Sequence, residues 1–148
     1  MKIPPDITLR ESTDADGDFV NTLTRSVMKS YVEATWSSAI DRERYYFKNR
    51  FQQPNTNIIQ CNGNAIGRIT IRYLADRVII DGIHIVDAFQ GQGIGRSLMT
   101  QIIEAANKKD MPVELILLKS NPVKKLYDAL GFHLYKEDLY HYYMSTAA

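Results

Sequence analysis

Apolar residues recur along this chain at two spacings, every second residue and every third or fourth residue. Ile7-Thr8-Leu9-Arg10 alternates residue by residue, which predicts a short first strand. Ser12-Thr13-Asp14 follows as a cluster of residue types that cap helices. Beyond it, Phe19, Leu23 and Val27 fall on one helical face, so their spacing predicts an amphipathic helix.

A second helix and a pair of strands are expected next. The charged and aromatic stretch from residue 39 to about residue 51 predicts a helix that ends before Gln53-Pro54-Asn55. Residues 57–61 and 65–73 have the composition of strands. Asn62-Gly63-Asn64 lies between them and is a strong hairpin signal.

The second half of the chain alternates between strands and helices. An apolar run at 78–86 predicts a strand, and apolar residues at helical spacing from Ile94 predict a helix after it. A buried strand at 113–118, a short helix around Tyr127 and two final strands complete the pattern. The predicted order, β-α-α-β-β-β-α-β-α-β-β, is that of an α/β layer structure with a mixed sheet.

Length and composition exclude several classes of protein. A chain of 148 residues is expected to form a single domain, residues 1–148. Its net charge of +1 gives no reason to expect binding to nucleic acid or to a membrane surface. The single cysteine, Cys61, excludes an internal disulfide, and the three histidines lack metal-ligand spacing, so we expect no metal. With no apolar run of ~18 residues, the default expectation is a soluble, cytoplasmic protein.

Three glycines at alternate positions, Gly91, Gly93 and Gly95, connect the predicted 78–86 strand to its helix. Glycine tolerates positive φ and lets a ligand approach the backbone closely. The free N–H groups of the first helical turn favour an anion there. The loop therefore predicts a site for a phosphate or pyrophosphate. It is not a dinucleotide fingerprint, because Arg96 or Leu98 occupies the third glycine position. It is not a Walker A loop, because Gly91 to Gly95 is one residue too short and Arg96 replaces the lysine.

Two sequence blocks resemble the GCN5-related N-acetyltransferase (GNAT) superfamily. Gln90-x-x-Gly93-x-Gly95 is similar to its acyl-CoA pyrophosphate loop, and residues 118–132 are similar to its second landmark, an Asn followed by a helix that carries Leu-Tyr and ends in Gly-Phe. The resemblance covers nearly the whole chain. It implies a single-domain GNAT fold, with a mixed, mostly antiparallel central sheet flanked by helices.

The resemblance also implies a set of residues that bind acetyl-CoA. The pyrophosphate would bind to backbone N–H groups of the loop, and the pantetheine arm would form main-chain hydrogen bonds with the preceding strand. A later asparagine would contact the pantetheine or orient a tyrosine. The residues that match these positions are Gln90, Gly91, Gln92, Gly93, Ile94, Gly95 and Arg96 in the loop, Ile83, Ile85 and Val86 in the strand, and Asn121.

For catalysis, the resemblance implies a phenol close to the thioester sulfur, and Tyr127 matches that position. A thiolate leaves more easily if a donor protonates it or hydrogen-bonds to it, so we expect Tyr127 to be the general acid. A simple packing role for Tyr127 is the alternative. Asp81 stands in an otherwise apolar strand, where burial would raise a carboxyl pKa and suit a general base. An ion pair with Arg68 or Arg72 is the equally weighted alternative, and His84 is the second candidate base.

The implied activity is that of an acyl-CoA-dependent N-acyltransferase, which moves acetyl from acetyl-CoA to a primary amine by direct attack in a ternary complex. The acceptor would be a small-molecule or peptide amine. The alternative is a catalytically silent acyl-CoA-binding module that acts as a sensor or interaction domain. GNAT-like proteins often dimerise, so the resemblance leaves the choice between a monomer and a homodimer undecided. Candidate acceptor-binding residues are Tyr31, Glu33, Trp36 and Tyr143.

Overall fold

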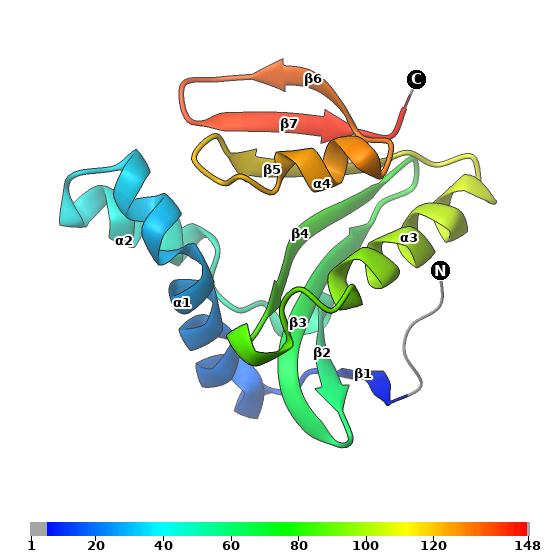
Figure 1. Ribbon diagram of the computed structural model, residues 1–148, viewed down its shortest axis with the longest axis horizontal. Helices are drawn as coiled ribbons and strands as arrows, with labels where there is room; N and C mark the ends of the chain where they lie inside the picture. Colours follow the sequence, from blue (N-terminus) through cyan, green and yellow to red (C-terminus); the bar gives the residue numbers. More distant parts are fainter. Residues whose placement is uncertain (1–5, 148) are drawn as a thin grey trace.

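The structure, a computed structural model, describes residues 6–147. The predicted order of helices and strands is confirmed (Figure 1). The helices are α1 (Gly17–Thr35), α2 (Ala39–Lys48), α3 (Ile94–Asn107) and α4 (Lys124–Ala129). The strands are β1 (Ile7–Glu11), β2 (Thr56–Cys61), β3 (Asn64–Tyr73), β4 (Val78–Ile85), β5 (Val113–Leu118), β6 (His133–Glu137) and β7 (His141–Ser145).

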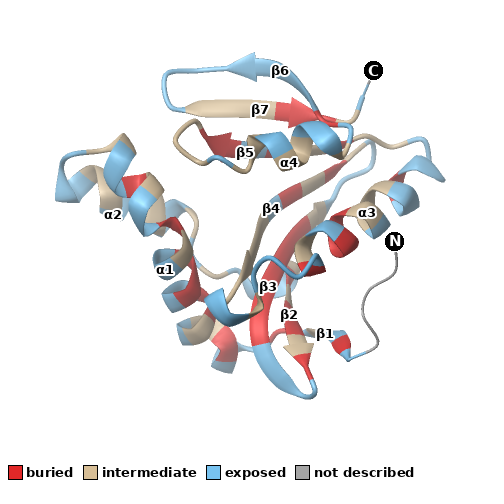
Figure 2. Cartoon of the chain, in the orientation of Figure 1, coloured by how far each residue is buried: buried red, intermediate tan, exposed pale blue. Residues whose placement is uncertain are grey.

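These strands form one seven-stranded sheet in the order β1-β2-β3-β4-β5-β7-β6. The β4–β5 pair is parallel and every other pair is antiparallel. The mixed, mostly antiparallel sheet expected from the sequence is therefore confirmed. Figure 2 shows the buried residues concentrated in the central strands and on the sheet-facing sides of α1 and α3, while β6 is exposed along its length.

Helices cover both faces of the sheet, and β5 shows how the two faces divide. Leu117 belongs to the core that α3 closes with Leu98. Its neighbour Leu118 packs instead with Met28 and Val32 of α1. Because successive strand residues point to opposite faces, α3 and α1 lie on opposite sides of the sheet (Figure 1).

Two turns of the chain, the β2–β3 turn and the end of α2, have identifiable causes. Asn62 and Gly63 have φ values of 49° and 82°, the left-handed pair that a two-residue hairpin turn requires. α2 ends at Lys48 rather than near Phe51, so the longer helix predicted from the sequence is wrong. Asn21 explains this difference, because its Oδ1 accepts the Phe51 N–H at 2.8 Å and draws the chain towards α1.

The feature that positions the site is a separation of β4 from β5. Their parallel pairing ends at Ile80 and Leu115. At the same point the register with β3 shifts, because Thr70 pairs with Gly82 and Ile71 with Ile80, which leaves Asp81 as an extra residue. Such a bulge bends the strand, so β4 and β5 diverge beyond it. The extra residue is Asp81, next to the glycine of the strand, Gly82.

Candidate active site

A cavity of about 1550 Å³ lies where β4 and β5 diverge. Its walls come from α1, α2, β4, β5, α4, β7 and the loop before α3. Residues from both faces of the sheet line it, from Gly93 and Tyr127 on the α3 side to Tyr45 and Arg68 on the α1 side. The cavity can therefore admit two ligands from opposite faces.

The glycine loop forms one end of this cavity. Gly91 and Gly93 have φ values of 76° and 81°, in the left-handed region that favours glycine. A Cβ on either would meet no atom within 4 Å, so the space beside them is open. α3 starts after Gly93, whose carbonyl accepts the Ser97 N–H at 2.9 Å. The N–H groups of Ile94, Gly95 and Arg96 precede that first helical bond and remain free for an anion.

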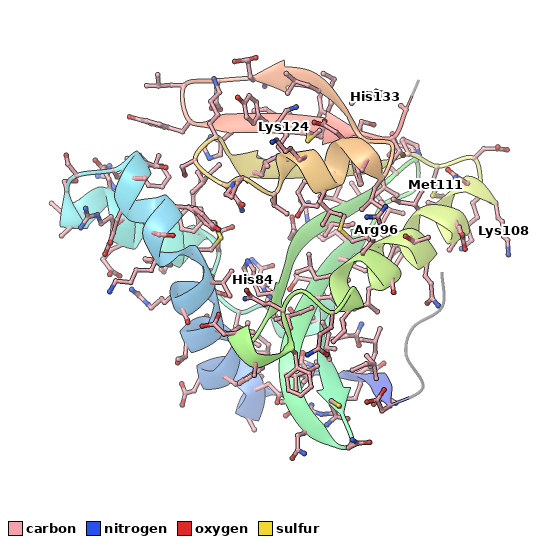
Figure 3. All side chains as sticks on the ribbon, in the orientation of Figure 1. His84, Arg96, Lys108, Met111, Lys124 and His133 are labelled. Atoms are coloured by element: carbon pink, nitrogen blue, oxygen red, sulfur yellow. The ribbon has the colours of Figure 1, made fainter. Side chains whose placement is uncertain are left out.

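Side chains around the loop support its shape. Gln90 donates from Nε2 to the Ile85 carbonyl at 2.8 Å, and Gln92 donates from Nε2 to the Ala88 carbonyl at 3.2 Å. Gln90 thereby holds the loop against the end of β4, and Gln92 holds it against the short helical turn Asp87–Phe89 that follows. Arg96 is exposed, lines the cavity and extends from α3 on the side of α4 (Figure 3). It is the loop cation best placed to meet a phosphate.

The main chain of β4 offers unpaired groups to the cavity. The Val86 N–H donates to the Ile66 carbonyl on β3 at 2.8 Å. Backbone directions alternate along a strand, so the main chains of Ile85 and Ile83 face away from β3, towards the gap. The Ile85 carbonyl already accepts from Gln90 Nε2, so the unpaired groups are the Ile85 N–H and the main chain of Ile83. The Val86 carbonyl accepts the Phe89 N–H at 3.0 Å, so both main-chain groups of Val86 already have a partner, and its contact with pantetheine stays a prediction.

Tyr127 and Asn121 bring side-chain donors to the α3 side of the cavity. Tyr127 packs edge-on against Phe132, with ring centroids 5.7 Å apart. Burial raises the pKa of Tyr127 to about 12. Its hydroxyl has no hydrogen-bond partner within residues 6–147. Asn121 accepts the Val123 N–H through Oδ1 at 3.1 Å, which leaves its Nδ2 donor unused.

Arg68 is the central polar group on the α1 side, and it was not among the site residues predicted from the sequence. Its side chain is only 4% exposed. It donates to the Thr70 hydroxyl at 2.6 Å and to the Thr24 hydroxyl at 3.3 Å. Burial lowers the pKa of Arg68 to about 10. The sequence feature that pointed to a buried group here is Gly82. A Cβ at position 82 would lie 2.7 Å from a guanidinium nitrogen of Arg68, so glycine leaves the space that Arg68 occupies.

His84 lies beside Arg68, between α1 and β4 (Figure 3). Its Nδ1 is 3.2 Å from Arg68 Nε and 3.0 Å from a second guanidinium nitrogen. A guanidinium can only donate, so Nδ1 accepts and Nε2 carries the hydrogen. Burial, and then the Arg68 charge, lower the pKa of His84 to about 3. Neutral His84 therefore has no free lone pair, which opposes the role of base suggested by the sequence.

Asp81 lines the cavity, but the expectation that it is buried is wrong, since its side chain is 36% exposed. Both carboxylate oxygens accept from Arg72, at 2.6 and 3.1 Å. The ion pair that the sequence left open therefore forms with Arg72 rather than Arg68. The bulge causes this exposure, because it turns Asp81 out of the regular pleat beside Arg72.

Three of the four candidate acceptor residues line the cavity. Tyr31, Trp36 and Tyr143 do so, and Trp36 packs against Tyr45 and Tyr140 with centroid separations of 5.7 and 5.3 Å. Glu33 does not belong to the lining and is exposed on α1, so its expected place in the pocket is wrong.

A carboxylate at the β6–β7 turn orders two further side chains of the lining. Asp138 accepts from the Tyr143 hydroxyl at 2.8 Å and lies 2.9 Å from His141 Nδ1. The Tyr143 hydrogen bond raises the pKa of that phenol. If His141 donates through Nδ1, its Nε2 lone pair is free, which makes this histidine a second candidate base.

Residues 6–147 lack two kinds of feature that would change this picture. No helix there combines the length and apolar character that spanning a membrane requires. No group of three or more His, Cys, Asp or Glu side chains there could hold a metal ion.

Comparison with known proteins agrees with this geometry. The model of the acetyltransferase (GNAT) domain family matches residues 19–143. The PaiA N-acetyltransferase of Thermoplasma acidophilum, solved with coenzyme A, has a TM-score of 0.76 at 16% identity, over 96% of this chain and 99% of that one. Arabidopsis thaliana Naa50, solved with the bisubstrate analogue CoA-Ac-MVNAL, has a TM-score of 0.68 at 16% identity, over 97% and 99%.

A third neighbour is longer than this chain. N-acetylglutamate synthase of Neisseria gonorrhoeae, solved with coenzyme A and N-acetyl-glutamate, has a TM-score of 0.65 at 17% identity, over 93% of this chain and 34% of that one. No curated protein sequence matches this chain significantly. At these identities the structural neighbours establish the shared fold.

Proposed function

This chain belongs to the GNAT acetyltransferase family, whose model matches residues 19–143, and we propose that it transfers acetyl from acetyl-CoA to a primary amine by direct attack in a ternary complex. One observation carries the proposal. The open loop at Gly91 and Gly93 and the unpartnered Tyr127 hydroxyl line the same cavity. A pyrophosphate on the loop would therefore leave the thioester within the compartment that contains a phenol donor.

The residues on the α3 side fit acetyl-CoA. Free N–H groups at Ile94, Gly95 and Arg96 suit the pyrophosphate. The main chain of Ile83 and Ile85 offers donors and acceptors to the amide groups of pantetheine, as a sheet edge does to an added strand. The unused Asn121 Nδ2 adds one more donor. PaiA was solved with coenzyme A and Naa50 with a coenzyme A conjugate, and both ligands are consistent with this assignment.

In the chemical step, a bond forms between the amine nitrogen and the acyl carbon, while the bond from that carbon to sulfur breaks. Tyr127, with a pKa of about 12, stays protonated at neutral pH. A thiol has a pKa near ~8.5, so complete proton transfer from Tyr127 to sulfur is uphill by about 3.5 pKa units. We therefore propose that Tyr127 donates a hydrogen bond to the departing thiolate instead of acting as the general acid expected from the sequence. The thiolate then takes its proton from solvent.

The amine must lose a proton, and Asp81 is the base we propose, acting through water. It lies on the α1 side of the cavity, and each of its carboxylate oxygens has a lone pair beyond the Arg72 bond. His141 is the second candidate. Asp81→Asn is expected to lower kcat/KM for the amine about a hundredfold, while His141→Gln changes it much less. The reverse ranking would assign the proton transfer to His141.

An acceptor panel with acetyl-CoA, followed by thiol release, tests the activity. We expect release with at least one primary amine, and calorimetric binding of acetyl-CoA but not of ATP or NAD. Acetyl-CoA binding without transfer to any amine would favour the silent acyl-CoA-binding module. Absence of acetyl-CoA binding would overturn the assignment of the glycine loop.

A further inference from the structure

Arg68 is a buried cation without an acidic partner. Its side chain is 4% exposed, and its hydrogen-bond partners are Thr24, Thr70 and His84, which are all uncharged. No ion pair of Arg68 occurs among residues 6–147. A buried charge without a counterion is expensive, which points to a ligand that supplies one.

The acids of the cavity wall are already paired with other arginines. Glu43 pairs with Arg25 at 2.8 Å, and Asp81 with Arg72 at 2.6 Å. Asp41, the third acid of the lining, is 3.6 Å from Arg44. The Tyr45 phenol, whose pKa burial raises to about 12, is neutral at pH 7. Asp81 is the lining acid whose charge acts on Arg68, but both of its oxygens accept from Arg72. No acidic side chain of the lining therefore bonds to Arg68 directly.

The guanidinium is held in one position. Its hydrogen bonds are accepted by the Thr70 hydroxyl on β3, His84 Nδ1 on β4 and the Thr24 hydroxyl on α1. Gly82 provides the space against which it lies, since a Cβ at that position would be 2.7 Å from one nitrogen. Gly82 directly precedes Ile83, whose main chain faces the gap. The cation thus lies beside the β4 segment that would hold the pantetheine arm.

We propose that Arg68 binds a carboxylate of the acceptor, so the acceptor is a small amine that carries a carboxylate, such as an amino acid. This inference rests on the proposed acetyl transfer and names its substrate class. Arg68 would act as a specificity residue, because its charge and the second N–H on the nitrogen that bonds Thr70 can meet one carboxylate oxygen. The apolar and aromatic lining, including Met28, Tyr31 and Trp36, would contact the rest of the acceptor.

Matched pairs of the common amino acids and their carboxamides test the proposal, since the members of each pair differ in the charge that Arg68 would recognise. For wild type we expect kcat/KM for at least one acid to exceed that for its amide about tenfold or more. In Arg68→Gln the acid-to-amide ratio should fall at least about thirtyfold. The basicity of the two amines in a pair is the same for every variant of the protein. A change in the acid-to-amide ratio between wild type and Arg68→Gln therefore reports the contact between Arg68 and the carboxylate.

Arg10→Gln is the control, since it removes an arginine whose ion pair with Asp16 lies outside the cavity lining. It should leave the ratio unchanged. Arg68→Lys should restore part of the selectivity, since it keeps the charge without the planar fork. Equal losses for acid and amide in Arg68→Gln would show a purely structural role and overturn the proposal, as would a wild type that prefers amides.

Direct binding separates this inference from the proposed activity. Amino acids titrated calorimetrically into the coenzyme A-saturated protein should bind to wild type and at least about thirtyfold more weakly to Arg68→Gln. Binding that depends on Arg68 without any thiol release would sustain the carboxylate site and refute the acetyl transfer. Thiol release from uncharged amines, with no amino acid bound, would refute the carboxylate site alone.

Discussion

The two sides of the cavity present different kinds of polar group. On the α3 side, main-chain groups predominate, with the amides after Gly93 and the main chain of Ile83 and Ile85. On the α1 side the polar groups are side chains, led by Arg68 and His84. A donor molecule shared by a family can be recognised through backbone geometry, whereas an acceptor that differs between proteins needs replaceable side chains.

The two sides of the cavity also differ in how burial affects the charge of their side chains. Burial raises the pKa of Tyr127 to about 12 on the α3 side, so this phenol is neutral. On the α1 side burial acts on groups that carry or can gain charge, and it lowers the pKa of both Arg68 and His84. We therefore expect the α3 side to work across a wide pH range and the α1 side to depend on pH and on single charges.

The largest effect is expected from Tyr127→Phe, which removes the hydroxyl and keeps the ring on Phe132. We expect kcat to fall about a hundredfold, with little change in acetyl-CoA affinity measured by calorimetry. Tyr135→Phe is the matched control, because Tyr135 is an exposed phenol on β6 outside the cavity lining. Full activity in Tyr127→Phe would leave Tyr127 as a packing residue only.

The second prediction concerns stability and tests the pH sensitivity of the α1 side. His84 has a pKa of about 3 in the folded protein and near ~6.5 when unfolded. The unfolded chain thus binds a proton that the folded chain does not, so stability falls as pH drops from about 6.5 towards 3. Between pH 6.5 and 4 the loss should be about 3 kcal/mol by denaturant unfolding.

His84→Gln removes this titration and should flatten the curve over that range. The Arg10 hydrogen bond lowers the pKa of Asp16 to about 2 from 3.8, so its stabilising contribution begins to fall near the lower end of this range. That fall is the same in both proteins, so the difference between their two curves reports His84. A slope that persists unchanged in His84→Gln would mean that other groups carry the pH dependence.

The two sides of the cavity also differ in how well the sequence predicts them. Gly91, Gly93 and Gly95 are close in sequence and form one turn, so a short motif predicts the loop. The order of helices and strands follows from local periodicity and is confirmed. Arg68, by contrast, meets Thr24 across 44 residues and His84 across 16. No local pattern marks such a cluster, because it exists only after β3, β4 and α1 have packed.

Asp81 shows why single residues in strands are hard to predict. An acid within an apolar run suggests burial, but a bulge changes which way the side chain points. The register shift beside Thr70 places Asp81 next to Arg72, and alternation alone cannot reveal it. Gly82 carried a usable signal, since a glycine in a strand indicates close approach of another group.

The third prediction compares two glycines that share a backbone conformation. Gly93 has φ 81° and Gly63 has φ 82°, and neither has an atom within 4 Å of a built Cβ. Alanine at either position should cost about 1 kcal/mol of unfolding free energy. Only Gly93→Ala should weaken acetyl-CoA binding, about tenfold, because Gly63 lies in the β2–β3 turn. Equal affinities in the two variants would mean that the loop does not hold the donor.

The smallest effect is expected at Glu33, and it sharpens the boundary of the α1 side. Glu33 is exposed on α1 and lies outside the cavity lining, whereas Tyr31, two residues earlier, lines it. Residues two apart on a helix point in different directions, so Glu33→Gln should leave the acceptor KM within about twofold, as surface changes usually do. Tyr31→Ala should raise that KM. An effect of Glu33→Gln equal to that of Tyr31→Ala would mean that the acceptor reaches beyond the cavity onto the outer surface of α1.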